Sequence, residues 1–132
     1  MIYKESIKLK VKSQKFSNIT GKVEDVLRKS KIKNGLCSLF SVGSTSAILI
    51  NENDPMLLED FRKSMEKIAP ESGIYQHPMN AFSHIRSMIL GNSHSIPVED
   101  GKMMLGTWQE IFIANFDTSD REREVIVTIS GD

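Results

Sequence analysis

Residues 36–50 read Leu-Cys-Ser-Leu-Phe-Ser-Val-Gly-Ser-Thr-Ser-Ala-Ile-Leu-Ile, and this stretch decides the fold class. Two runs rich in apolar and β-branched residues, 36–42 and 46–50, lie on either side of the small residues Gly43-Ser44-Thr45. Short apolar runs bounded by turn residues are typical of β-strands. The second run is apolar on both faces, so we expect it at a central position in a sheet.

Further strands are predicted on both sides of this pair. Residues 6–12 alternate Ile, Leu and Val with lysine, a period of two that is typical of a half-buried strand and suits a sheet edge. Residues 94–98 and 102–105 lie on either side of an Asp-Gly pair that favours a hairpin. The remaining strand predictions cover residues 109–116 and 124–129.

Three segments have the spacing of amphipathic helices. The first begins near Thr20 as a candidate cap and ends before Asn34-Gly35, and the second begins at Pro55 after a capping Asp54 or Asn53. The third covers about 80–90 and ends at Gly91-Asn92. The pattern predicts one α+β domain over residues 1–132, with about seven mostly antiparallel strands and three helices.

The composition narrows the classes of function. Seventeen Lys and Arg residues balance seventeen Asp and Glu residues, so the formal net charge is zero and nothing draws the chain to nucleic acid or an acidic membrane. A single cysteine, Cys37, cannot form an internal disulfide and is interpreted as an inert packed thiol. With no signal peptide recognisable at the N-terminus, we expect the cytoplasm as its location.

The histidines give the first candidate site. His84 comes four residues after Asn80, so both lie on one face of the third helix, and His77 precedes them in a loop. Two imidazoles from a loop and a helix can converge on one divalent metal ion. The spacing is no fixed metal signature, and the alternative is a set of hydrogen-bonded surface histidines.

Two polar clusters lie at the ends of the predicted strand 46–50. Asn51 and Glu52 follow it, and Glu52 has the chemistry of a general base or metal ligand, with helix capping as the alternative. Ser44 and Thr45 precede it, where small hydroxyl residues after Gly43 can present N–H and hydroxyl groups to an anion such as phosphate. An ordinary hairpin turn is the alternative there.

The only tryptophan lies between two hydrogen-bonding side chains. Trp108 can stack on a flat ring while Thr107 and Gln109 hold its polar atoms, or it can be a core residue with outward-facing neighbours. The segment 121–124, Arg-Glu-Arg-Glu, mixes charges and is interpreted as a solvated turn and strand start.

Taken in order, these clusters resemble the YjbQ family, small proteins credited with a secondary thiamine-phosphate synthase activity. The motifs that carry the resemblance extend over most of the chain. They are Gly35-Leu36, Ser44-Thr45, Ile50-Asn51-Glu52-Asn53, Tyr75-Gln76-His77, Asn80-Ala81, His84-Ile85, Leu90-Gly91-Asn92-Ser93, Pro97-Val98, Gly101 and Leu105-Gly106-Thr107-Trp108-Gln109.

The resemblance implies a β-sandwich-like pair of sheets, a homotrimer with pockets near the subunit boundaries, and a divalent metal, zinc or magnesium, at His77 and His84. It assigns catalytic roles to Glu52, His77 and His84. The implied substrate-binding residues are Ser44, Thr45, Asn51, Asn80, Ser93, Thr107, Trp108 and Gln109. One departure matters: many family members have His-Thr-Thr or His-Thr-Ser where this chain has Gly43-Ser44-Thr45.

The implied reaction joins a hydroxymethylpyrimidine diphosphate to a thiazole phosphate and releases pyrophosphate. Such a site needs cations, yet Arg86 and Lys102 are the nearest basic residues in the sequence. We therefore expect a weak or side activity. The alternatives are a metal-dependent hydrolase or lyase with Glu52 as base, and a non-catalytic trimer that binds a small ligand.

Overall fold

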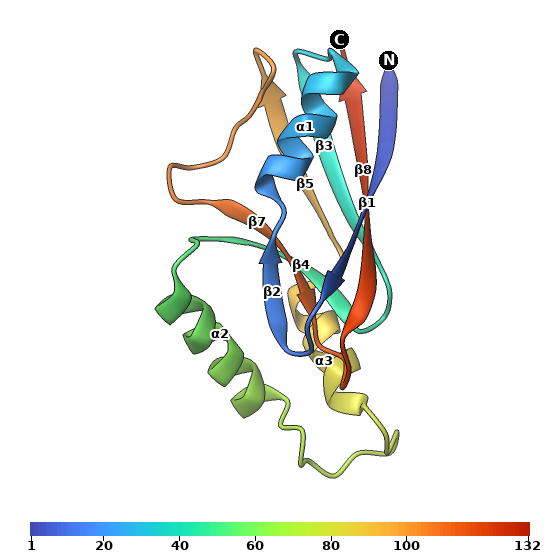
Figure 1. The fold of residues 1–132 in the computed structure, drawn as a ribbon, viewed down its shortest axis with the longest axis vertical. Coiled ribbons are helices and arrows are strands. Elements are labelled where there is room, and N and C mark those ends of the chain that lie inside the picture. The colour runs from blue at the N-terminus through green and yellow to red at the C-terminus, as the bar shows by residue number, and fades with distance from the viewer.

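Strands with alternating apolar residues build a five-stranded antiparallel sheet in the computed structural model, which describes residues 1–132 (Figure 1). The strand order is β1-β8-β3-β5-β6. The bounds are β1 (Ile2–Val11), β3 (Gly35–Val42), β5 (Ser93–Glu99), β6 (Lys102–Met103) and β8 (Arg121–Gly131). The lysine-bearing strand β1 lies at the sheet edge, as its sequence predicted.

A second sheet of three strands has the order β2-β7-β4, with β2 (Lys15–Asn18), β4 (Ser46–Asn51) and β7 (Glu110–Asn115). The prediction of a central position for β4 was wrong, because β7 is the central strand. The free edge of β4 is covered by the end of a helix: Ile48 N–H donates to Gly91 O, and Ser87 Oγ donates to Ser46 O. Because the end of α3 covers β4 on this side, β4 is apolar on both faces although no strand pairs with this edge.

The core lies between the sheets. From β8, Val125, Val127 and Ile129 are fully buried, and Ile111 and Ile113 of β7 belong to the same cluster. Burying one such side chain stabilises the fold by about 1.5–3 kcal/mol. Asn115 of β7 and Arg123 of β8 follow the same alternation and are buried on the inward face as well.

Three helices complete the chain: α1 (Thr20–Ser30), α2 (Pro55–Ile68) and α3 (Ala81–Leu90). The Asp54 side chain accepts a hydrogen bond from Met56 N–H and Pro55 is the first residue of α2, as predicted. Thr20 is the first helical residue rather than the cap, and its hydroxyl accepts from Ile111 N–H. None of the helices is long and apolar enough to cross a membrane.

The predicted elements are present, with some changes of extent. The hairpin between β5 and β6 has Asp100 and Gly101 at φ 52° and 76°, the left-handed conformation that an Asp-Gly pair favours. There are eight strands rather than seven, because the four-residue β2 was missed. Such a short strand forms by pairing with β7, and its own sequence gives little signal.

Candidate functional site

The N-terminal part of α3 and the loop before it bring two histidines together. The ring centroids of His77 and His84 are 5.2 Å apart and the ring planes are nearly perpendicular, at 85°. His77 Nε2 and Asn80 Oδ1 are hydrogen-bonded at 3.0 Å. His77, Asn80 and His84, which the sequence predicted as one candidate site, therefore form one cluster.

Asp117 extends this cluster, and the sequence analysis did not identify it. It is buried, just beyond the end of β7, and its carboxylate accepts hydrogen bonds from Asn80 Nδ2 and Thr45 Oγ1, both at 3.4 Å. Arg121 Nη1 donates to the same carboxylate at 2.9 Å. Hydrogen bonds thus connect His77 to Thr45 and Arg121 through Asn80 and Asp117.

The pKa of Asp117 lies below its ordinary value through opposing effects. Burial acts to raise this pKa. The hydrogen bonds from Thr118 N–H and Asn80, together with the positive charges of Arg121 and Arg123, act in the other direction and prevail. Asp117 is therefore ionised at neutral pH and contributes a negative charge to the cluster.

Arg123 is the second residue that the sequence analysis misjudged. It was interpreted as solvated, but it is only 4% exposed. Its Nη2 donates to Thr45 O, Thr45 Oγ1 and Asn115 Oδ1, and burial lowers the pKa of its guanidinium. The alternation of β8 carried the signal, because Arg123 shares the inward face with Val125.

Arg86, which the sequence suggested as a cation for ligands, is engaged within the structure. It is buried, and its Nε and Nη2 both donate to Ala69 O, at 3.0 and 2.8 Å. Its Nη1 donates to Gln14 Oε1 at 2.7 Å, and Nη2 also forms an ion pair with Glu66. The side chain therefore joins α3 to the end of α2 rather than facing a ligand.

The other predicted site residues lie at the opposite end of the small sheet. In the register of β4 with β7, Ser46 is opposite Asn115 and Asn51 is opposite Glu110. The five residue steps between these pairs span about 17 Å. Thr45 and the histidine cluster are beyond one end, whereas Glu52 and Gln109 are beyond the other. Within one copy of the chain, these two groups do not meet around one small molecule.

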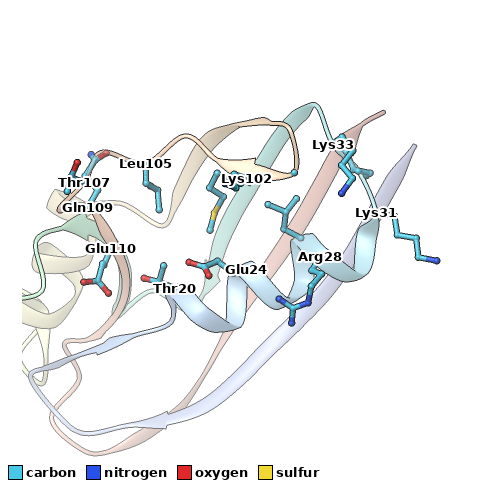
Figure 2. Close-up of a pocket in the computed structure, with 14 residues that line it drawn as sticks. Thr20, Glu24, Arg28, Lys31, Lys33, Lys102, Leu105, Thr107, Gln109 and Glu110 are labelled. Atoms are coloured by element: carbon cyan, nitrogen blue, oxygen red, sulfur yellow. The ribbon is translucent and has the colours of Figure 1, made fainter.

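Thr107 and Gln109 line a cleft of about 590 Å³ between α1 and the segment 101–110 (Figure 2). Figure 2 shows Leu105 pointing into it, Glu24 and Glu110 toward one end, and Lys33 at the other. Trp108 does not line this cleft and is 71% exposed, so its interpretation as a core residue is excluded. Lys102 also lies on the cleft, away from the histidines.

Ser93 and Ser44 are the other two residues that were predicted to bind substrate. Ser93 is exposed on β5, where it pairs in register with Phe40, and the structure gives it no contact with the histidines. Ser44 is exposed between Gly43 and the buried Thr45, at the start of β4. Of the two hydroxyl residues in this loop, Thr45 is the one that is hydrogen-bonded into the cluster.

The residues fit a catalytic zinc ion only in part. His77 and His84 are close enough to share one ion, but catalytic zinc takes three protein ligands. No group of three or more His, Cys, Asp or Glu side chains in the structure is arranged to hold a metal. The chain alone therefore supplies an incomplete ligand set.

Comparisons with known proteins agree with this architecture. A family model described as UPF0047 protein YjbQ-like matches residues 5–132. A UPF0047 protein of Methanothermobacter thermautotrophicus is 44% identical over 117 residues, which cover 86% of this chain and 81% of that protein. The YjbQ protein of Salmonella typhimurium is 31% identical over the whole of both chains.

Solved structures give the same result. A YbjQ-like protein of unknown function from Sulfolobus solfataricus superimposes with a TM-score of 0.91 at 33% identity, covering all of both chains. The YjbQ/UPF0047 protein of Clostridium acetobutylicum gives a TM-score of 0.85 at 34% identity, covering 94% of this chain and 99% of that one. The chain therefore belongs to the YjbQ family.

Proposed function

We propose that this protein is a transferase of the thiamine-phosphate synthase type, with weak or side activity. It would join a hydroxymethylpyrimidine diphosphate to a thiazole phosphate and release pyrophosphate. The observation that supports this best is the presence of Arg121 and Arg123 beside the His77–Asn80–Asp117 cluster. The main objection from the sequence was a scarcity of basic residues around the motifs, and these two arginines weaken it.

The chemistry matches the groups available. The thiazole nitrogen forms a bond to the pyrimidine CH₂ carbon while the C–O bond to the diphosphate breaks, and pyrophosphate leaves with the electron pair. The leaving group gains negative charge, which nearby cations stabilise. Thiazole nitrogen has no proton to lose, so His77 or His84 would act by donating a hydrogen bond or a proton to the departing oxygen.

A divalent metal, zinc or magnesium, remains part of the proposal at His77 and His84. Such an ion would neutralise diphosphate charge. Because two histidines do not complete a site, its remaining ligands would have to come from the substrate, solvent or another copy, and no step above depends on it. Glu52, proposed as a base, would act only if a second copy brought it near the histidines.

A cytoplasmic homotrimer is the assembly we propose. The outer face of the five-stranded sheet exposes Leu36, Phe40 and Val42 on one strand, with uncharged Ser95 and Thr128 on the strands beside it. Glu124, opposite Val42, adds a charge at one end of this strip. An apolar strip with a polar and charged rim is typical of a subunit interface. Assembly would also let the Thr107–Gln109 segment of one copy approach the histidine cluster of another.

The test is to incubate the purified protein with both phosphorylated substrates and detect thiamine phosphate by mass spectrometry. Chelator-treated protein is compared with protein given zinc or magnesium, and bound metal is measured in parallel. We expect product formation that falls about 10²-fold or more in His77→Ala and His84→Ala, the usual size of a general acid–base contribution. His94→Gln is the matched control, because His94 contacts Ile48 O on β4 rather than the cluster.

An absence of product at high protein concentration, with either metal present, would refute the proposal. In that case, turnover of other small phosphorylated compounds would favour a metal-dependent hydrolase or lyase. Ligand binding without any turnover would favour a non-catalytic trimer.

A further inference from the structure

Arg123 is a buried cation without a carboxylate partner. Of the five N–H groups on a guanidinium, the two on Nη2 have acceptors. The Nε group is buried and has no partner, and Nη1 makes no hydrogen bond within the chain. The nearby carboxylate of Asp117 forms its ion pair with Arg121 instead. The cluster therefore has two arginines and one carboxylate.

This arrangement is unfavourable unless something else supplies negative charge. Removing an ion from water is costly when no opposite charge and no complete set of hydrogen bonds replace the water. Arg86 shows the usual solution in the same molecule, since its donors reach Ala69 O, Gln14 and Glu66. The missing partner of Arg123 is therefore expected to be an anion from outside the chain.

The loop next to Arg123 offers further donors. The backbone N–H groups of Gly43, Ser44 and Thr45 donate no hydrogen bond within the chain. The loop is held in place because Asn92 Nδ2 and Ser46 Oγ both donate to Gly43 O. Successive free N–H groups of this kind form the concave sites in which proteins bind phosphate.

Glycine at position 43 lets the loop lie close to the guanidinium of Arg123. Gly43 has φ 140°, and a Cβ atom there would lie 3.0 Å from Arg123 Nη1 and 3.2 Å from Ser46 Oγ. Any larger residue at this position would crowd Nη1, so glycine is what allows the loop N–H groups and Nη1 to lie side by side.

We propose that the Gly43–Thr45 loop and Arg123 bind the phosphoryl group of a small-molecule substrate. Three backbone N–H groups and the two N–H groups of Nη1 exceed the roughly four acceptor positions of a carboxylate, whereas a phosphoryl group has three strongly accepting oxygens. Thr45 Oγ1 contacts both Arg123 and Asp117, so the bound phosphoryl group would lie beside the hydrogen-bonded chain that leads to His77. The inference deepens the proposed function and rests on it for the identity of the substrate.

The binding itself is tested with inorganic phosphate and the intact protein. In ¹H–¹⁵N spectra, the Arg123 Nε–Hε signal is assigned by its loss in Arg123→Lys. Titration with phosphate should shift that signal and the backbone amide signals of Ser44 and Thr45 along one saturable curve. Acetate and chloride at equal ionic strength should produce no matching curve. A linear response, or the same response to chloride, would overturn the inference.

Variants supply a second measurement. Arg123→Met should weaken phosphate binding at least tenfold, whereas Lys22→Met, which removes one exposed positive charge from α1, should leave it unchanged. Equal binding by Arg123→Met and the wild type would also overturn the inference. If Arg123→Met does not fold, the wild-type titration still decides.

The outcome is separable from that of the proposed function. Saturable phosphate binding at Arg123 without any thiamine phosphate product would refute the transferase and leave the phosphoryl site standing. Product formation without a response at Arg123, Ser44 and Thr45 would do the reverse. Titration with pyrophosphate and with thiazole phosphate then distinguishes the diphosphate end of one substrate from the monoester of the other.

Discussion

Replacing Arg86 by methionine should destabilise the fold strongly while leaving phosphate binding intact. Methionine keeps an unbranched apolar stem of similar reach, so the change mainly removes the guanidinium. That group donates to Ala69 O and Gln14 Oε1, forms an ion pair with Glu66 and lies 4.8 Å from the ring centroid of Phe82. The contacts with Ala69, Gln14 and Glu66 join α3 to the segments that precede it, whereas the contact with Phe82 lies within α3.

The expected loss can be worked out from these contacts. Hydrogen bonds from a charged donor to Ala69 O and Gln14 Oε1 contribute about 1.5 kcal/mol each. The Glu66 side chain is 45% exposed, so solvent screening limits the ion pair to about 0.5 kcal/mol. The Phe82 ring adds about 0.5–1 kcal/mol. The total is about 4 kcal/mol, which corresponds to a fall in Tm of roughly 15 °C for a domain of this size.

Urea unfolding followed by circular dichroism measures this loss. The control is Arg62→Met, which removes a partly exposed arginine paired with Glu59 within α2 and should have a much smaller effect, because solvent screens this pair. A loss from Arg86→Met no larger than the control would refute the structural role of Arg86. So would a phosphate response abolished in folded Arg86→Met, since Arg86 would then belong to the ligand site.

Two further predictions concern charge and assembly. The folded pKa of Asp117 is lowered, so its ionised form stabilises the protein above the unfolded pKa of about 3.9 and this contribution is lost as the pH falls through the folded value. Thermal unfolding should therefore show Asp117→Asn less stable than wild type by about 1 kcal/mol at pH 7, and this difference should shrink as the pH falls below about 4. A difference that does not change with pH would contradict the assignment. For the proposed trimer, light scattering of the wild type should give three times 14.9 kDa, about 45 kDa. Phe40→Glu should give a monomer, whereas the control Met56→Glu, at another exposed position, should keep the trimer mass. An unchanged mass for Phe40→Glu would exclude this face as the interface.

Local patterns were enough to predict most of the fold. The alternation in β1, the Asp54–Pro55 start of α2 and the Asp100–Gly101 turn each depend on a few neighbouring residues, and each is present in the structure. The position of β4 was not predictable in this way. Apolar residues on both faces show that a strand is covered, but they do not distinguish a second strand from the end of α3.

In the candidate site, too, the residues that are close in sequence could be predicted, and those brought in by strand pairing could not. His77, Asn80 and His84 are close in sequence: helical spacing places His84 one turn after Asn80, and the short loop before α3 brings His77 to both. Asp117 and Arg123 reach the cluster through the pairing of β7 with β4 and of β8 with β3. The mixed charges of residues 121–124 indicated a solvated segment, and they outweighed the alternation along β8, which places Arg123 on the inward face with Val125.

A net charge of zero does not describe the charge that a ligand would meet. Asp117 is paired with Arg121, and Arg86 has its own acceptors, so Arg123 alone remains uncompensated. It lies beyond one end of β4, whereas Gln109 and its neighbour Trp108 lie beyond the other. A substrate with a phosphoryl group and a flat ring would need both kinds of contact. Within one copy they are too far apart to serve the same small molecule. The phosphoryl site can therefore exist in a monomer, but the proposed transfer reaction requires a second copy to bring the aromatic residue to it.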